Sequence, residues 1–333
     1  MSVNNFEHKH SAHCESGVMS SMLRHNGIDI SEPMVFGMSG ALTFAYLPFI
    51  KMGGMPLIAY RSMPKSIIKN IQKNLKLKMK LETFSKKEKG QKRLDELLEE
   101  GKIVGIQTSV YWLPYFPEEM RFHFNAHNLL VFKKDGKNYK VSDPVFEHTQ
   151  ECDEESLLKA RFATGIMAPK GLVYYPIDVP KSIDLKPVIL KNIKKTAKTM
   201  LNTPVPIAGL RGIGYLAKTI KKLSSKDIRY AKLFLGHIVR MQEEIGTGGA
   251  GFRYLYASFL QESSVIFNND KTLIEASEMM LEVGDNWREF ALMIAKSIKS
   301  KNSIDFIAIS DKLLFIKDEE SKVYKKMLEF RGK

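Results

Sequence analysis

Hydrophobic residues in the first 180 positions gather in short runs or alternate with polar ones, whereas later they recur every three to four positions. The first pattern is typical of strands between short helices, and the second is typical of amphipathic helices. We therefore predict an α+β domain over residues 1–180 and an all-helical domain over residues 181–333. Strands are expected near 56–60, 103–107, 129–132 and 139–141, and helices near 14–25, 64–76, 91–100, 188–201, 213–223, 226–245, 271–300 and 303–330.

The predicted strand pair within residues 129–141 brings a histidine and an aspartate close together. A two-residue Asp-Gly turn would place Asp143 opposite Asn128. A three-residue loop ending on a left-handed Gly136 would place Asp143 opposite His127 instead. In that second register the carboxylate and the imidazole share one face of the sheet, where the carboxylate can orient the ring.

Cys14 lies in the first turn of the predicted helix 14–25, which ends before Gly27. The partial positive charge at a helix N-terminus favours a thiolate over a thiol, so this position suits a nucleophile. With His127 and Asp143, Cys14 would complete a set of nucleophile, base and orienting residue. The alternative is an inert cysteine in a short buried helix.

The second cysteine, Cys152, lies between Glu151 and the acidic residues 153–155. Neighbouring carboxylates raise the pKa of a thiol, so we expect Cys152 to be a poor nucleophile with no catalytic role. Two cysteines in 333 residues do not make a disulfide framework, which favours a reducing cytoplasm.

Four potential metal ligands lie close together near the N-terminus, namely His8, His10, His13 and Cys14. A structural zinc site needs a second pair of Cys or His residues at matching spacing, and the sequence offers none. We therefore expect an exposed polar segment here and no bound metal.

Aromatic residues concentrate in two stretches that contain glycine or proline and are expected to be loops. The first contains Phe44 and Tyr46, and the second contains Trp112 and Tyr115. His123 follows shortly before the central strand pair. We predict that these five side chains line a substrate cleft and limit the access of water.

The glycine-rich segment 246–251 precedes an aromatic helix. Its backbone amides could bind an anion at the start of that helix, or the segment could cover the cleft as a movable lid. A tight connection between two helices is the simpler interpretation.

The formal net charge of +14 is concentrated in two segments. Residues 63–93 contain 11 Lys and Arg against two Glu, and residues 179–226 contain 11 against one Asp. Such local charge favours an acidic partner. Aromatic residues are not interleaved with these lysines, so we expect no nucleic acid. No apolar run reaches the roughly 18 residues of a membrane span, and no signal-like segment opens the sequence, so we expect a cytoplasmic protein.

Several short motifs follow one another along the chain: His13-Cys14-Glu15, Ser31-Glu32 with Phe36-Gly37, Leu113-Pro114-Tyr115, His123-Phe124 leading to His127, and the glycine-rich segment with Phe252-Arg253. In this order they resemble the family of the N-terminal domain of butirosin biosynthesis protein H. The last motif resembles the uncharacterised helical domain that usually follows it. The resemblance spans most of the chain.

The resemblance implies a papain-like cysteine-protease fold of the α+β class, with Cys14 as nucleophile, His127 as base and Asp143 as its orienting residue. It also places His8 where papain-like peptidases carry a glutamine that donates to the oxyanion. The founding member of the family is an acyltransferase.

An activity follows from the same resemblance. An acyl group would pass from the phosphopantetheine of an acidic acyl carrier protein to an amine or hydroxyl of a small-molecule acceptor. This would be a step of secondary-metabolite or lipid-like biosynthesis, and it would need no cofactor held by this chain. The alternatives are a cysteine peptidase or amidase, and a catalytically silent binding module.

Overall fold

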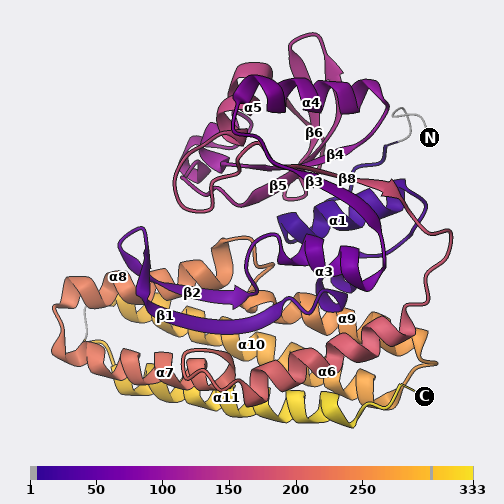
Figure 1. Cartoon of the computed structure of the whole chain (residues 1–333). Helices are drawn as coiled ribbons and strands as arrows, with labels where there is room; N and C mark the ends of the chain where they lie inside the picture. Colours follow the sequence, from indigo (N-terminus) through magenta and orange to yellow (C-terminus); the bar gives the residue numbers. More distant parts are fainter. Residues whose placement is uncertain (1–5, 301–302, 333) are drawn as a thin grey trace. The chain divides into compact units, whose positions relative to one another are not determined.

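The computed structural model describes residues 6–300 and 303–332, and Figure 1 shows the elements that they form. The chain divides into two compact units. The α+β unit comprises the chain up to Val35 and residues Pro64–Ile183, and the helical unit comprises Phe36–Met63 and the chain from Asp184 onward. The last crossing, between Ile183 and Asp184, lies close to the predicted boundary after residue 180. Residues 36–63, which the sequence analysis placed in the first domain, belong instead with the helices.

A six-stranded antiparallel sheet forms the centre of the α+β unit, with the strand order β3-β8-β4-β5-β6-β7. Its strands are β3 (Lys78–Glu82), β4 (Val104–Thr108), β5 (His127–Asp135), β6 (Asn138–Ser142), β7 (Gln150–Asp153) and β8 (Val173–Asp178). The two central strands, β4 and β5, contain nearly continuous apolar runs because helices cover both of their faces. The predicted strands 103–107, 129–132 and 139–141 are confirmed.

Helices α1 (Cys14–His25) and α3 (Ser66–Asn74) lie on one face of this sheet, and α4 (Lys87–Glu99) and α5 (Glu154–Arg161) lie on the other (Figure 1). Leucines of α4 and α5 pack against the strands to form an apolar core. The three isoleucines of α3 are fully buried on one side of this helix, which confirms the predicted helix 64–76. The arrangement of strands and helices confirms the α+β class of this part of the chain.

The aromatic stretch after Gly40 is a strand rather than the predicted loop. It forms β1 (Leu42–Met52), which pairs with β2 (Met55–Arg61) as a two-stranded antiparallel sheet in the helical unit. Alternate residues point into that unit, so Phe44 and Tyr46 are 0% and 3% exposed. Their rings pack on Trp287 and Phe234 respectively. The prediction that Phe44 and Tyr46 line a substrate cleft is therefore wrong, because both side chains are core residues.

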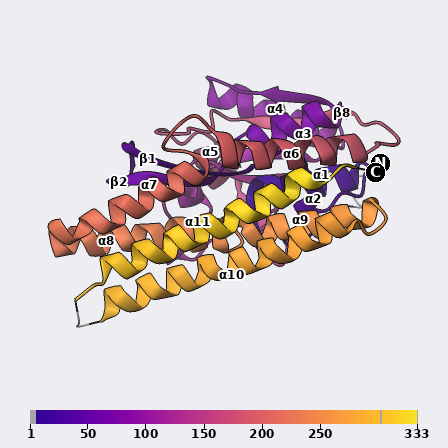
Figure 2. The same ribbon diagram turned by 90° about the horizontal axis from the view of Figure 1, so that it is seen from below.

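Six long helices complete the helical unit, and Figure 2 shows α10 and α11 running side by side. They are α6 (Lys186–Asn202), α7 (Gly209–Lys221), α8 (Ile228–Val239), α9 (Arg253–Ile266), α10 (Lys271–Lys299) and α11 (Phe306–Glu329). These helices occupy the segments that the apolar periodicity predicted. In the part of the chain that the structure describes, none of the helices is apolar over a length that would cross a membrane.

The glycine-rich segment 246–251 is a packed connection between α8 and α9. Ala250 is fully buried, and its amide donates to the Glu243 carboxylate. A Cβ atom added at Gly251 would lie 2.2 Å from the Tyr60 ring, so only glycine fits this close approach. The connector interpretation is confirmed. The anion-binding alternative is wrong for Ala250, because a carboxylate of the same chain already occupies its amide.

Candidate active site

The His127 imidazole and the Asp143 carboxylate form a buried pair. His127 begins β5 and Asp143 follows the end of β6, and His127 Nε2 lies 2.7 Å from Asp143 Oδ2. Asp143 is fully buried and His127 is 4% exposed. Because Nε2 donates its proton to the carboxylate, the other ring nitrogen, Nδ1, is left to interact with a further group.

The register of the hairpin differs from both predicted alternatives. The strands meet at a two-residue turn, and a bulge then shifts the pairing so that Leu130 lies opposite Ser142. If this register is continued, Asp143 lies opposite Leu129, and His127 is its diagonal neighbour. Side chains alternate between the faces of a sheet, so this two-residue offset still leaves His127 and Asp143 on one face. The direct pairing was wrong, and the shared face is confirmed.

Cys14 is the first residue of α1, which packs against β5. The predicted helix 14–25 is confirmed at both ends. The Cys14 side chain lies close enough to the His127 ring to raise its pKa, and Cys14 is 7% exposed. The structure therefore brings Cys14, His127 and Asp143 together, although they are far apart in sequence.

The start of α1 is held by two side chains. The His13 ring accepts a hydrogen bond from the Ser16 amide at 3.3 Å, which makes His13 the N-cap. The Glu32 carboxylate accepts from the amides of Ala12 and His13, both at 2.8 Å. These amides precede the helix and have no partner within it. Apart from the family resemblance, no sequence pattern predicted this role for Glu32.

Glu15 links α1 to α3. Its fully buried carboxylate accepts hydrogen bonds from the amides of Lys65, Ile67 and Ile68 at 3.0–3.3 Å. The N-cap residue Lys65 has no capping side chain of its own, so Glu15 supplies the cap from the neighbouring helix. The sequence signal for this role is a carboxylate placed within the buried first turn of α1.

Burial alone would lower the pKa of His127, but the charge and hydrogen bond of Asp143, together with Cys14, raise it to about 10. A raised pKa favours the protonated ring, which is the form that can give a proton to a leaving group. A cysteine beside such a ring is the pairing used where cysteine acts as a nucleophile.

Aromatic side chains shield this pair from solvent. The Phe116 ring meets the His127 ring edge-on at 5.5 Å, and Phe146 packs against Phe116 at 4.9 Å. The half-buried Tyr115 contacts Phe146 and donates its hydroxyl proton to Asp143 Oδ2 at 3.0 Å. Tyr115 was predicted as a cleft wall, whereas its hydroxyl is bonded directly to Asp143.

His8 does not have the oxyanion-binding position that the resemblance implied. Its Nε2 lies 2.9 Å from the Phe146 carbonyl oxygen, and its Nδ1 lies 2.7 Å from the Ser142 hydroxyl. A carbonyl can only accept, so Nε2 carries the proton and Nδ1 accepts from the hydroxyl. Both nitrogens are therefore engaged, and the prediction that His8 contacts substrate is wrong. The Cys14 backbone amide, at the start of α1, is then the candidate donor for an oxyanion.

Two predicted cleft residues lie at the surface of the α+β unit. Trp112 is 37% exposed, and the Lys159 ammonium group lies 5.5 Å from its ring. His123 is exposed and stacks on Tyr111, with 4.1 Å between the ring centroids. The roles of Trp112 and His123 in substrate binding stay predictions.

Cys152 is 1% exposed and lies in β7. Burial, and secondly the charge of Asp153, raise the pKa of its thiol to about 12. Burial therefore contributes more than the neighbouring carboxylates on which the sequence reasoning relied.

We expect iodoacetamide at neutral pH to label Cys14 well before Cys152, because only the thiolate reacts and the pKa of the Cys152 thiol is raised to about 12. Peptide mass spectrometry after short exposures would measure both rates. The Cys152→Ala variant is the control and should keep the wild-type labelling of Cys14. Faster labelling of Cys152 would contradict the assignment of Cys14 as the nucleophile.

The N-terminal histidines do not form a metal site with Cys14. His13 caps α1, and His8 is bonded to the Asp143 loop. Within residues 6–300 and 303–332, no three His, Cys, Asp or Glu side chains are grouped so as to hold a metal ion.

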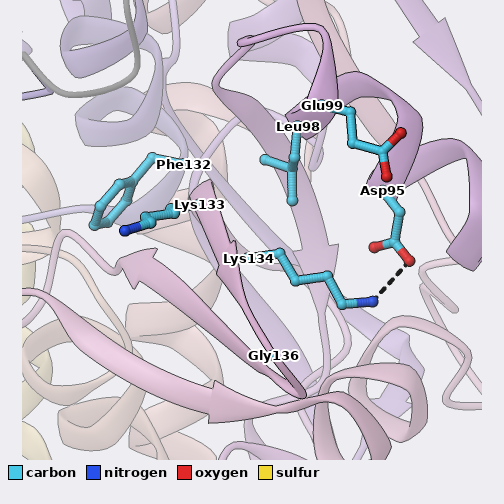
Figure 3. A pocket seen from close by; sticks show the side chains of 7 residues that line it. All are labelled: Asp95, Leu98, Glu99, Phe132, Lys133, Lys134 and Gly136. Atoms are coloured by element: carbon cyan, nitrogen blue, oxygen red, sulfur yellow. Dashed lines mark hydrogen bonds and ion pairs between the residues drawn. The ribbon is translucent and has the colours of Figure 1, made fainter.

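A surface hollow of about 390 Å³ lies elsewhere in the α+β unit, between α4 and the β5–β6 turn (Figure 3). It is lined by Asp95, Leu98, Glu99, Phe132, Lys133, Lys134 and Gly136. Two of its charged groups already pair with one another, since Lys134 Nζ lies 2.8 Å from Asp95 Oδ2. None of Cys14, His127 and Asp143 lines it, so we do not assign the candidate active site to this hollow.

Comparisons with known proteins identify the family. Residues 13–144 match the family described as butirosin biosynthesis protein H, N-terminal, and residues 155–327 match the domain of unknown function DUF4872. A crystal structure described as that of a C39-like peptidase from Bacillus anthracis is similar over 52% of this chain and 95% of its own. That similarity has 14% identity and a TM-score of 0.36. No curated protein matches. The chain therefore belongs to the family in which an N-terminal domain of the butirosin biosynthesis protein H type is followed by a DUF4872 domain.

Proposed function

We propose that this protein is a cysteine-dependent acyltransferase that uses Cys14, His127 and Asp143. The observation that carries the proposal is that Cys14 begins α1 close enough to the His127 ring to raise its pKa, while Asp143 holds that ring at 2.7 Å. The name of the matched N-terminal family, which refers to the biosynthesis of butirosin, supports a biosynthetic reaction. The resemblance to that family's founding acyltransferase points to acyl transfer from a thioester.

The reaction would proceed in two steps. The Cys14 thiolate attacks the carbonyl carbon of a thioester, a new carbon–sulfur bond forms, and the leaving thiolate takes the proton from His127. An amine or hydroxyl of the acceptor then attacks the acyl-enzyme and gives its proton to His127, and Cys14 leaves as a thiolate. One thioester is exchanged for another in the first step, so that step needs no additional activation.

The donor we propose is an acidic acyl carrier protein, which holds the acyl chain on its phosphopantetheine. Support comes from the basic segment around α6, where Lys191, Lys195 and Lys198 are exposed along one side of the helix. Their spacing of three to four residues places them in one row. A row of cations attracts an acidic partner and raises the rate of encounter.

Incubation with an acyl-loaded carrier protein should add the mass of the acyl group to the wild-type chain, and intact-mass spectrometry would measure it. Loading from the carrier should weaken as salt rises, because exposed attraction is screened within about 10 Å at 0.1 M. Loading from an N-acetylcysteamine thioester should be nearly independent of salt. Reversing the charge of Lys191, Lys195 and Lys198 should slow only the carrier-dependent reaction.

A matched control reverses three exposed lysines of α10 and α11, namely Lys271, Lys296 and Lys325, and should leave both reactions unchanged. An identical response of the two donors to salt and to the α6 variant would overturn the carrier-docking proposal. Rapid cleavage of unactivated peptides would favour a cysteine peptidase or amidase. Absence of any acyl-enzyme with either donor would favour a silent binding module.

A further inference from the structure

The Asp143 carboxylate uses both of its oxygens. Oδ2 accepts from His127 Nε2 at 2.7 Å and from the Tyr115 hydroxyl at 3.0 Å, and Oδ1 lies 3.3 Å from the Val145 amide. Asp143 has no solvent-exposed surface, so these three donors stabilise its charge in place of water. The Tyr115 hydroxyl therefore helps to stabilise the buried Asp143 carboxylate beside His127.

The Tyr115 hydroxyl acts as a hydrogen-bond donor to the Asp143 carboxylate. Burial, and secondly the charge of Asp143, raise the pKa of Tyr115, so the phenol stays protonated over the range in which the protein would act. Packing on Phe116 and Phe146 at 5.3 and 5.4 Å holds its ring in place. The Tyr115 hydroxyl and His127 Nε2 donate to the same Asp143 oxygen. The Tyr115 bond therefore reduces the negative charge that this oxygen presents to His127.

The loop that carries Asp143 is held from its other side by the segment that leads into Cys14. The His8 ring bridges Ser142 and Phe146, which flank Asp143 in the sequence. Close by, the Ser11 amide donates to the Pro144 carbonyl at 2.7 Å. The segment 8–11, just before Cys14, therefore holds the loop on both sides of Asp143 by hydrogen bonds.

Close packing at Gly17 shows that α1, the segment 8–11 and the Asp143 loop lie tightly against one another. A Cβ atom added there would lie 2.6 Å from Ser11 Cβ and 2.8 Å from Pro144 Cβ. The first turn of α1, the preceding segment and the Asp143 loop are thus in direct contact. A displacement of any one of them moves the others.

We propose that Tyr115 and His8 are positioning residues of this site, Tyr115 through the Asp143 carboxylate and His8 through the loop that carries it. The inference rests on the proposed function of Cys14, His127 and Asp143. It assigns new roles to two residues that the sequence analysis placed in substrate binding. Neither residue exchanges a proton or a bond with the substrate in this proposal.

Tyr115→Phe removes one oxygen atom and keeps the ring, so the aromatic packing is preserved. Acyl-enzyme formation should slow about 10-fold, the effect expected for one lost hydrogen bond to a charged group. With one donor fewer, Asp143 attracts the His127 proton more strongly. The titration of His127 should therefore move to higher pH, which NMR of protein labelled with ¹⁵N-histidine would measure.

Tyr111→Phe is the matched control, because Tyr111 is 41% exposed in the same loop and stacks on His123. It should change neither the rate nor the His127 titration. A Tyr115→Phe variant with an unchanged His127 titration would overturn the role of Tyr115, whatever its thermal stability. The NMR measurement needs no substrate, so this outcome is distinct from a failure of the proposed acyl transfer, which Cys14→Ala tests.

His8→Ala should loosen the loop, and the Val145 amide should exchange its hydrogen faster with solvent by about 10-fold or more. His8→Gln can donate to the Phe146 carbonyl and accept from the Ser142 hydroxyl, so it should restore much of the protection. His10→Ala, at an exposed residue of the same segment, is the control and should have no effect. Equal protection in His8→Ala and wild type would overturn the role of His8.

Discussion

Cys14→Ala is expected to abolish acyl-enzyme formation, and His127→Ala is expected to slow it by about 10²–10⁴-fold. The thiol is the only group of the three that can form the thioester bond. In the proposed reaction His127 supplies the proton that the leaving thiolate needs, and the Asp143 carboxylate, which raises the pKa of His127, holds that proton on the ring. Single-turnover loading from an N-acetylcysteamine thioester, followed by intact-mass spectrometry, would measure both effects.

Asp143→Asn should reduce the rate less than His127→Ala, because an amide oxygen can still accept from His127. Its NH₂ group would, however, face either the Val145 amide or the pair of donors from His127 and Tyr115. An NH₂ group that faces another hydrogen-bond donor cannot bond to it, which disfavours the wild-type geometry. Some activity should therefore be lost. His123→Ala, which changes an exposed ring, is the control, and a loss equal to that of His127→Ala would place the base elsewhere.

Arg253→Met is expected to destabilise the helical unit by about 3–5 kcal/mol, which is the cost of leaving a buried charge without its partner. Arg253 and Glu320 are both fully buried, with 2.9 Å between Arg253 Nε and Glu320 Oε1. Glu320 also accepts from Trp287 at 2.6 Å and from Tyr324 at 2.9 Å. These contacts join α9, α10 and α11, so losing the arginine weakens the contacts between these three helices.

Thermal unfolding followed by circular dichroism would measure this loss in the full chain. Arg288→Met is the matched control, because Arg288 is on α10, its side chain is 53% exposed and its pair with Glu243 is 3.8 Å long. An exposed pair of this kind contributes about 1 kcal/mol or less. Similar melting temperatures for the two variants would show that the buried pair does not stabilise the bundle.

The local features of the site could be predicted from the sequence. Apolar residues recur at helical spacing directly after Cys14, so a helix that begins there could be predicted. This signal is local, because it depends only on residues that are close in sequence. Only the predicted register with the three-residue loop put His127 and Asp143 on one face, because side chains alternate along a strand. The observed register differs from that one by two residues, which is an even number, so the shared face is kept. The register with the two-residue turn would have put the two residues on opposite faces.

The register itself depends on tertiary structure. A bulge in β5 moves the pairing by one residue, and the turn lies one residue later than either predicted loop. The position of the bulge and the position of the turn both depend on which apolar residues pack against α4 and α5. Residues that are neighbours in the sequence do not by themselves determine this packing. The same limit explains the β1–β2 hairpin. Glycines and Pro48 suggested a loop, whereas burial against α7 and α10 makes residues 42–52 a strand.

What the sequence alone determined is the set of chemical groups and the elements that carry them: a cysteine at a helix start, a histidine and an aspartate at the ends of two paired strands, and a helical second half. Only the tertiary structure decided which side chains support those groups. Tyr115 and His8 reach the Asp143 loop from 28 and 134 residues away in sequence, and both were predicted to contact substrate instead. The physical reason is that periodicity reports which face of an element is buried. The donor that satisfies a given buried carboxylate is fixed by how distant segments pack.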